Sequence, residues 1–547
     1  MAVSIPARCD KKEEMKRVEI SPEVPWPGYR AFPEQLNLAE EVLRPELTRE
    51  RGQRTALIGE NGAITYHALQ QRVDAVAAGL IELGVQKSDR VLIAMMNRAE
   101  FALVFLAAVK LAIIPVLVNS ALSPNELTSV ATSVAPRLII TESALSSAAR
   151  EIRYRHLVGG IVCVGDPAPD EIPFDTLLKN PGTTIKYAET AANEPAFIVY
   201  TSGTTGKPKG IVHAHRWIVA LGDLNRYRLP PQINDVVMAT GEWSFISALG
   251  HNLLFPLRNG ITGAVLAGRA TAENLLGHIE KYRVTVLYSV ATVYRRLLAM
   301  PGFEKTHDLK SLRCAHSTGE ALREATYREW RRRVGAELYE HYGVSEYQLV
   351  IGQGVRHPVK AGSVGKLLSG VAVDILDDEF KPVPSGELGQ FAISTRDPGL
   401  FLGYYQDDER TQTVVRNGWY FTGDLAYQDA EGYFYIAGRR DDCFKSRGIF
   451  ISPTEVENAL QKHPAIVEAA VVPNPDVEIG NKIRAVIVLA DGYEGSELLA
   501  EQIREAMRRE IAPFKIPQEI QFAQSLPKSA IGKILRSELV LPLPTRL

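Results

Sequence analysis

Apolar residues recur at helical spacing along residues 66–83, where the sequence reads YHALQQRVDAVAAGLIEL. This pattern predicts an amphipathic helix that ends at Gly84, because glycine readily adopts the left-handed conformation that follows many helices. The apolar run RVLIAM at residues 90–95 then has the length and composition of a buried strand. A helix followed by a short buried strand is typical of a parallel α/β sheet.

Further short apolar runs continue this alternation and indicate a parallel sheet that is covered on both faces. They lie at residues 138–140, 160–164 and 196–200. The longest apolar stretch, residues 101–118, is about one bilayer span in length. It contains Lys110 and Pro115 and has no aromatic belt. We therefore interpret it as a buried helix that runs into a buried strand.

The hydrophobic pattern changes in the last third of the chain. From about residue 362 to residue 435, short alternating runs separated by turns predict an antiparallel barrel or sheet. Beyond Arg439 the sequence predicts a compact α+β unit. Its elements are a helix at 453–462, strands at 466–472 and 483–489, and a charged amphipathic helix at 496–510.

Composition adds limits on function and location. The 547 residues carry 62 Lys+Arg against 64 Asp+Glu, a net charge of -2, and 46% are hydrophobic. These values are ordinary for a globular protein and give no electrostatic reason to expect nucleic acid or an acidic membrane as partner. The four cysteines form no CxxC pair, and the N-terminal residues lack the apolar core of an export signal. We expect a cytoplasmic protein.

The segment Tyr200–Gly210, YTSGTTGKPKG, combines glycines, hydroxyl residues and lysines after a predicted strand. Backbone N–H groups and ammonium charges of this kind can surround phosphate oxygens. The spacing is not that of a P-loop, because Gly203 and Gly206 enclose two residues and Lys207 precedes proline. A surface hairpin is the structural alternative.

This segment resembles the phosphate loop of the adenylate-forming superfamily, which includes acyl-CoA synthetases, peptide-synthetase adenylation domains and luciferases. The resemblance extends from about residue 38 to the end and is strongest to medium-chain acyl-CoA synthetases and benzoate-type CoA ligases. Further matching blocks follow in family order: GEAL at 319–322, YGVSE at 342–346, GWYFTGD at 418–424, GRRDDCFKSRG at 438–448 and PKSAIGK at 527–533.

The resemblance implies a fold and a domain organisation. It implies an α/β fold with a large N-terminal domain, residues 1–438, built of parallel α/β subdomains and a small β-barrel. A mobile α+β C-terminal domain, residues 439–547, would follow, with a hinge at Asp441. This domain would present Lys533 for adenylation and then rotate to present another face for thiol attack.

The resemblance also implies the chemistry. A carboxylic acid would be coupled to AMP with release of pyrophosphate and then transferred to CoA with release of AMP. Two anions meet in the first step, so cations must be positioned in advance. Lys533 would bridge the carboxylate and the α-phosphate, and Glu346 would hold Mg²⁺. ATP, Mg²⁺ and CoA are the expected cofactor and co-substrates.

Nucleotide contacts are implied residue by residue. Tyr342 would stack on adenine, and Glu340 stands where Asn or Asp commonly meets the adenine amino group. Asp424 would accept both ribose hydroxyls, and Arg439 would also contact the ribose. The other expected ATP and AMP contacts are Thr201, Ser202, Gly203, Thr204, Thr205, Gly206, Lys207, Gly319, Glu320 and Ser345.

The acyl pocket and the CoA path are expected in further segments. Residues 243–254, 288–292 and 317–320 would surround the acyl group, and they contain no Lys or Arg. A hydrophobic monocarboxylic acid, medium-chain or aromatic, is therefore favoured. The expected acyl-pocket residues are Trp243, Phe245, Ala248, Leu249 and Val290. The expected CoA contacts are Lys445, Ser446, Arg447 and Gly448, the last leaving room for pantetheine.

A luciferase-like oxygenase, which needs an unusual substrate, stays open, and so do two further functions. The first is an adenylation enzyme that loads an amino or aryl acid onto a carrier protein, although no carrier domain follows Lys533. The second is a non-catalytic acyl or nucleotide sensor, which would not need Lys533, Glu346 and Asp424. The expected partners are a small carboxylic acid, ATP and CoA, without nucleic acid or a membrane span, and a homodimer remains open.

Overall fold

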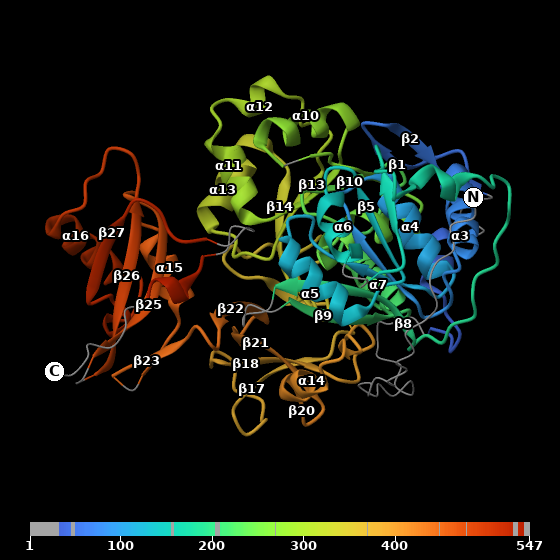
Figure 1. Ribbon diagram of the computed structural model, residues 1–547. Coiled ribbons are helices and arrows are strands. Elements are labelled where there is room, and N and C mark those ends of the chain that lie inside the picture. The colour runs from blue at the N-terminus through green and yellow to red at the C-terminus, as the bar shows by residue number, and fades with distance from the viewer. Residues whose placement is uncertain are drawn as a thin grey trace. The chain divides into compact units, whose positions relative to one another are not determined.

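The computed structural model describes residues 32–44, 50–154, 158–202, 208–268, 270–368, 370–447, 449–476, 479–528 and 534–540. Contacts divide the chain into two compact units, which Figure 1 shows in ribbon form. The first contains the described residues up to Ala372 together with Ile393–Tyr420. The second contains Val373–Ala392 and the described residues from Phe421 onward. The boundary expected at residues 438 and 439 stays a prediction.

The first predicted helix is confirmed as α3, Tyr66–Glu82. The Thr65 side chain accepts a hydrogen bond from the N–H of Ala68 and caps its N-terminus. Gly84 has φ +74° just after the helix, as expected for a glycine in this place. The predicted strand follows as β3, Arg90–Ala94, which is buried along most of its length.

Within the described part of the first unit, one sheet has eight strands in the order β19-β9-β8-β4-β3-β5-β6-β7. β3 pairs in parallel with β4 and β5, whereas β8 and β9 form an antiparallel hairpin. Apolar residues of α5 (Pro124–Val134) and α6 (Ser146–Tyr154) pack on this sheet. The remaining strands are β4 Ile114–Leu117, β5 Leu138–Glu142, β6 Ile161–Val164, β7 Ile172–Pro173, β8 Pro195–Ser202, β9 Pro208–Ala214 and β19 Gly403–Tyr404.

The long apolar stretch is a helix and a strand, as predicted. Helix α4, Ala99–Lys110, is buried from Phe101 onward, and β4 follows it. The Lys110 ammonium is paired with Asp74 of α3 inside the protein, which removes the cost of an isolated buried charge. Across the described residues, none of the helices has the length and apolar character needed to cross a membrane.

A second sheet of the first unit runs in the order β16-β15-β14-β13-β12-β10-β11-β1-β2. Its central strands β10 to β14 are parallel, so their carboxyl ends meet at one edge. The strands are β1 Thr55–Gly59, β2 Gly62–Thr65, β10 Val236–Ala239, β11 Thr262–Ala264, β12 Val286–Ser289, β13 Cys314–Thr318, β14 Glu337–Tyr342, β15 Ile351–Gly352 and β16 Gly365–Leu367.

Helices cover both faces of this second sheet. One face packs on α10 to α13 through a core that includes Tyr294 and Trp330. The other face meets helix α7 and the π-helix η2, through contacts of Tyr288 with Arg228 and His251. The helices of this unit not yet given are α1 Leu38–Leu43, η1 Phe174–Leu178, α7 Trp217–Arg228, α8 Ile246–Ala248, η2 Leu249–Leu254, α9 Phe255–Arg258, α10 Ala272–Tyr282, α11 Ala291–Ala299, α12 Phe303–Thr306, α13 Glu324–Val334 and α14 Asp408–Val414. A further short strand, β20, spans Val415–Arg416.

The second unit contains the expected antiparallel strands and the expected α+β region. β21 and β22 pair antiparallel, and β25 and β26 form a long antiparallel pair beside α15 and α16. β27, which the sequence pattern did not predict, pairs in parallel with β26. The elements are β17 Val373–Leu376, β18 Gly389–Ser394, β21 Trp419–Gln428, β22 Tyr433–Arg439, β23 Phe444–Ser446, β24 Ile449–Ile451, α15 Pro453–Leu460, β25 Ile466–Asp476, β26 Gly480–Leu489, α16 Glu497–Met507, η3 Pro513–Lys515, β27 Glu519–Ala523 and η4 Arg536–Glu538.

Candidate active site

Glu346 lies in the turn after β14 and is 3% exposed. Its carboxylate accepts hydrogen bonds from Lys209 Nζ at 2.6 Å and from the Tyr404 hydroxyl at 2.7 Å. Burial alone would raise the pKa of this carboxyl, but the charge and hydrogen bond of Lys209 and the hydrogen bond of Tyr404 lower it below its ordinary value. Glu346 is therefore an ionised carboxylate inside the protein.

The β8–β9 hairpin positions the cation beside Glu346. Lys209 lies on β9 opposite Thr201 of β8, so the strands extend into the segment expected to be a loop. Lys209 Nζ also lies 4.8 Å from the centre of the Tyr404 ring, a cation–π contact. The expected contacts Gly203, Thr204, Thr205, Gly206 and Lys207, like the Ser202 side chain, lie outside the described residues.

The residues around Glu346 fit a magnesium site with few protein ligands. The Thr201 hydroxyl oxygen is buried and has no hydrogen-bond partner among the residues that the structure describes. Hydroxyl and carboxylate oxygens are the ligands that Mg²⁺ prefers, and the ion usually keeps one or two of them together with phosphate oxygens. No cluster of three or more His, Cys, Asp or Glu side chains suited to a metal occurs in the described part of the chain.

Glu340 differs from Glu346, although the two lie on and just after the same strand. Its carboxyl group is buried and accepts one hydrogen bond, from the N–H of Leu322 at 2.8 Å. Burial raises its pKa to about 8, against the small lowering from this hydrogen bond. Glu340 is therefore largely protonated at neutral pH and holds the segment at 319–322 against β14.

The other expected nucleotide contacts of the first unit lie at strand ends. Tyr342 is the last residue of β14 and is half-buried, and Ser345 follows in the turn. Gly319 follows β13 with φ +82°, a conformation that favours glycine. Glu320 is exposed, and its carboxylate accepts hydrogen bonds from the N–H and hydroxyl of Thr292 at 2.9 and 2.6 Å.

The expected acyl-pocket residues lie in and around η2. Trp243, Ala248 and Leu249 are buried, whereas Phe245 and Val290 are half-buried. The indole N–H of Trp243 donates to Asn252 Oδ1 at 2.8 Å, and its ring packs edge-on against an α4 side chain. Trp243 is thus held in a fixed orientation, and its contact with an acyl group stays a prediction.

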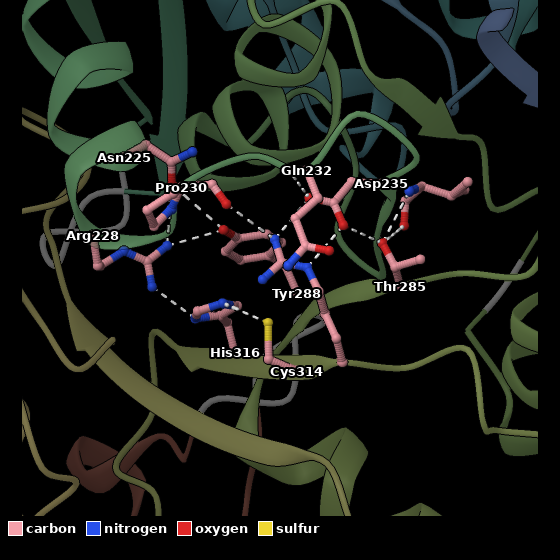
Figure 2. Close-up of polar contacts among 11 residues, drawn as sticks. Asn225, Arg228, Pro230, Gln232, Asp235, Thr285, Tyr288, Cys314 and His316 are labelled. Carbon is pink, nitrogen blue, oxygen red and sulfur yellow. Dashed lines mark hydrogen bonds and ion pairs between the residues drawn. The ribbon is translucent and has the colours of Figure 1, made fainter. Parts of the chain in front are cut away.

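A buried polar cluster that the sequence did not predict lies between α7 and the strands β12 and β13 (Figure 2). Arg228 at the end of α7 donates to the Tyr288 hydroxyl at 2.9 Å, to His316 Nδ1 at 2.7 Å and to Asn225 Oδ1 at 3.1 Å. The Tyr288 ring stacks on His316 and also on His251, at centroid distances of 4.5 and 4.2 Å. The segments expected to form the acyl pocket contain no Lys or Arg, and the guanidinium of Arg228 is bound by three neighbouring side chains rather than standing free.

Asp424 and Arg439 lie opposite each other on β21 and β22 in the second unit. Arg439 Nη1 is 3.4 Å from the Asp424 carboxylate and donates to the carbonyl of Thr422 at 2.8 Å. Gly423, which lies between Thr422 and Asp424 in the chain, has φ +82°. A Cβ on this residue would lie 2.9 Å from the Arg439 guanidinium. Glycine at this position therefore lets the arginine lie flat beside the carboxylate.

Three of the four expected CoA contacts lie on or directly after β23, which pairs antiparallel with β24 in the second unit. Lys445 and Arg447 are exposed, whereas Ser446 is buried and donates from its hydroxyl to the carbonyl of Asn481 at 2.7 Å. Asp441 is an exposed turn residue after β22. The two remaining expected residues, Gly448 and Lys533, lie outside the described residues.

Both parts of the chain are similar to known protein families. Residues 46–405 match the AMP-binding enzyme family, and residues 455–533 match the AMP-binding enzyme C-terminal domain. The chain belongs to the AMP-binding enzyme family. This AMP-binding enzyme is 33% identical to an uncharacterized acyl–CoA ligase of Bacillus subtilis, over 93% of this chain and 96% of the relative. It is 32% identical to the benzoate–CoA ligase of Thauera aromatica, with the same coverage of 93% and 96%.

A solved structure agrees with these relatives. An anthranilate CoA ligase in complex with anthranoyl-AMP superposes with a TM-score of 0.86 and 31% identity, over 93% of this chain and 97% of that chain. The predicted family and the predicted fold class are therefore confirmed. Membership of this CoA-ligase family implies ATP and CoA as substrates. The roles of individual site residues do not follow from these similarities and stay predictions.

Proposed function

We propose that this AMP-binding enzyme is an ATP-dependent, AMP-forming acid–CoA ligase that acts on a hydrophobic aromatic carboxylic acid. The observation that carries this proposal is the match along both parts of the chain to a family whose similar members include a benzoate–CoA ligase and an anthranilate CoA ligase. These relatives favour a ligase over a carrier-loading adenylation enzyme or a non-catalytic sensor.

The reaction has two displacements. In the first, a carboxylate oxygen of the acid attacks the α-phosphorus of ATP, and the bond to pyrophosphate breaks. In the second, the CoA thiol loses its proton and its sulfur attacks the acyl carbon, and the bond to AMP breaks. Both displacements develop negative charge on oxygen, which positioned cations stabilise.

The first unit supplies groups for the phosphate end of the substrate. Lys209 lies beside Glu346, so the ammonium charge is held in place by the carboxylate before the nucleotide binds. Glu346 and Thr201 would hold Mg²⁺, which supplies charge neutralisation on the phosphate oxygens. Tyr342, at the end of β14, would stack on the adenine.

The second unit supplies groups for the ribose and the thiol. The Asp424 carboxylate would accept the ribose hydroxyls, with Arg439 beside it. Lys533 would neutralise the reacting anions in the adenylation step. Lys445, Ser446, Arg447 and Gly448 would contact CoA. A cytoplasmic location and a homodimer also stay predictions.

The test separates the two displacements. Lys533→Ala should abolish adenylate formation, followed as ATP–pyrophosphate exchange with an aromatic acid, while CoA attack on a supplied acyl-adenylate stays largely intact. The control is Lys310→Ala, which removes an exposed lysine elsewhere in the chain and should change neither rate. Equal loss of both half-reactions in Lys533→Ala would contradict the role given to this lysine. Absence of AMP release with every aromatic acid tried would reject the ligase proposal itself.

A further inference from the structure

Two buried side chains near the strand ends have polar atoms without hydrogen-bond partners. His341 on β14 is 2% exposed, and neither of its ring nitrogens has a hydrogen-bond partner within the described part of the chain. Gln348 is 3% exposed, and no described residue donates a hydrogen bond to its side-chain oxygen. A buried polar atom left unpaired destabilises the folded protein, so such atoms point to a missing ligand group.

Both side chains border the same imidazole. The His341 ring centre lies 5.1 Å from the ring centre of His251, and the Gln348 amide nitrogen lies 3.2 and 3.5 Å from the two ring nitrogens of His251. His251 belongs to η2 and stacks on Tyr288, so both lie within the segments where we expect the acyl group. His341 directly precedes Tyr342, the expected adenine contact.

The backbone at Gln348 supports a functional role for this place. Gln348 has φ +99°, which is rare for a residue with a side chain and strains the backbone. Its neighbours leave it little space, because a Cβ on Gly250 would lie 2.7 Å from its amide nitrogen. The packing therefore holds the Gln348 amide in one position beside His251, despite the strain.

The hydrogen-bonding capacity of this place follows from its neighbours. Burial, and then the nearby charge of Arg228, lower the pKa of His341 and His251 well below their ordinary values. A neutral imidazole carries one N–H donor and one lone-pair acceptor. The Gln348 oxygen adds an acceptor. The groups available to a ligand are therefore one donor and one acceptor on the His341 imidazole and one acceptor on the Gln348 amide.

We propose that His341 and Gln348 bind a neutral hydroxyl or amino substituent on the ring of the aromatic acid. This inference rests on the proposed function, which places an aromatic acid beside η2 and the strand ends. A hydroxyl group can donate to the Gln348 oxygen and accept from the His341 N–H. An amino group can donate to both acceptors. The substituent thus supplies the partners that the protein lacks.

Other substituents fit this place less well. An unsubstituted ring leaves the imidazole and the amide oxygen unpaired, which penalises it against a hydroxylated ring. A second carboxylate is an acceptor only, so its charge would face the Gln348 oxygen. The site should therefore discriminate against unsubstituted and dicarboxylic aromatic acids alike.

The experiment measures kcat/KM for AMP release with CoA and a panel of acids. The panel is benzoate, the three hydroxybenzoates, the three aminobenzoates and isophthalate. The wild-type enzyme should use at least one hydroxy or amino acid about tenfold or more better than benzoate and isophthalate. In His341→Leu this ratio should fall toward one, mainly through a higher KM for the substituted acid, with benzoate turnover retained.

Matched variants separate recognition from stability. His278 on α10 is also buried with an unpaired ring nitrogen, so His278→Leu should leave the ratio unchanged. Gln348→Met is a second variant of the proposed site, and it should also reduce the preference for the substituted acids. It keeps the inference testable if His341→Leu does not fold.

The outcomes distinguish the two proposals. If benzoate or isophthalate is turned over as well as every hydroxy and amino acid, or if the preference survives in both His341→Leu and Gln348→Met, this inference is wrong and the ligase proposal stands. If no aromatic acid releases AMP, the proposed function fails, and the inference fails with it.

Discussion

Two glutamates only six positions apart differ in protonation state, because their carboxyl groups have different hydrogen-bond and charge partners. Glu346 is ionised because Lys209 and Tyr404 contact its carboxylate. Glu340 receives one backbone hydrogen bond and no cation, so burial raises its pKa to about 8. The sequence marks both as acidic residues near YGVSE but carries no sign of this difference.

Glu346→Gln tests the ionised carboxylate. It keeps the shape of the side chain but removes the charge that pairs with Lys209 and would hold Mg²⁺. The rate of ATP–pyrophosphate exchange should fall about 100- to 1000-fold, and more Mg²⁺ should be needed for half-maximal rate.

Glu171→Gln is the matched control for that loss of charge. Glu171 is a buried carboxylate paired with Arg150 at 3.1 Å, on the edge of the same unit. This variant should lower thermal stability without changing the Mg²⁺ dependence. An identical Mg²⁺ dependence in wild type and Glu346→Gln would remove Glu346 from the metal site.

The raised pKa of Glu340 predicts a pH dependence of stability. Between pH 4.5 and about 8 the unfolded chain loses this proton while the folded chain keeps it. Stability should therefore fall as pH rises through this window, by up to about 1.4 kcal/mol per pH unit from this group. Glu340→Gln should flatten the fall in melting temperature between pH 5.5 and 8, and equal slopes in the two proteins would contradict the prediction.

At the scale of elements, local patterns predicted several helices and strands in the first 200 residues and after Arg439, whereas the elements between about residues 208 and 342 were not predicted one by one. α3, α4, α15 and α16 follow from apolar spacing and their flanking residues, because helix formation depends on neighbours three and four positions away. β27 was missed, since a short strand with alternating polar residues gains its stability from the partner strand β26. The extension of β8 and β9 into the glycine-rich segment has the same cause.

Among the described glycines, Gly343 in the turn after β14 has the least room for an added Cβ. A Cβ on Gly343 would lie 1.5 Å from the Gln348 carbonyl oxygen, so the turn that places Glu346 has no room for alanine. Gly343→Ala should destabilise the protein by about 2–4 kcal/mol, with loss of ATP–pyrophosphate exchange.

Gly277→Ala provides the opposite case. Gly277 is an exposed residue of α10, and a Cβ added there would point into open space. Alanine at this position should stabilise the protein by about 0.5–1 kcal/mol through helix propensity. Melting temperatures of both variants, measured by calorimetry, test the pair. A Gly343→Ala protein as stable as wild type would show that the turn can open.

At the scale of the whole molecule, the residues expected to contact ATP are divided between the two units. Glu346 and Tyr342 belong to the first, whereas Asp424, Arg439 and the expected hinge residue Asp441 belong to the second. The predicted motion of the C-terminal domain between the two displacements would need a backbone hinge, for which Asp441 is the expected residue.

Asp441→Pro tests that motion, because proline fixes φ near −65° and restricts the residue before it. Adenylate formation should persist within about tenfold of wild type, while thioester formation slows by about 100-fold or more. Asp441→Ala, which removes the charge and leaves the backbone free, should keep both rates. Equal slowing of both half-reactions in Asp441→Pro would exclude Asp441 as the hinge.

The sequence by itself determined the family, the α/β fold class and the ligase chemistry, because these depend on ordered motifs and on periodicities of a few residues. Only the tertiary structure decided which groups meet. Tyr404 reaches Glu346 from β19, and Arg228 reaches Tyr288 from α7, across 58 and 60 positions of chain. Burial and contacts between residues far apart in the chain determine whether a side chain is charged and whether its polar atoms have hydrogen-bond partners. The local spacing of residues does not encode burial or such contacts.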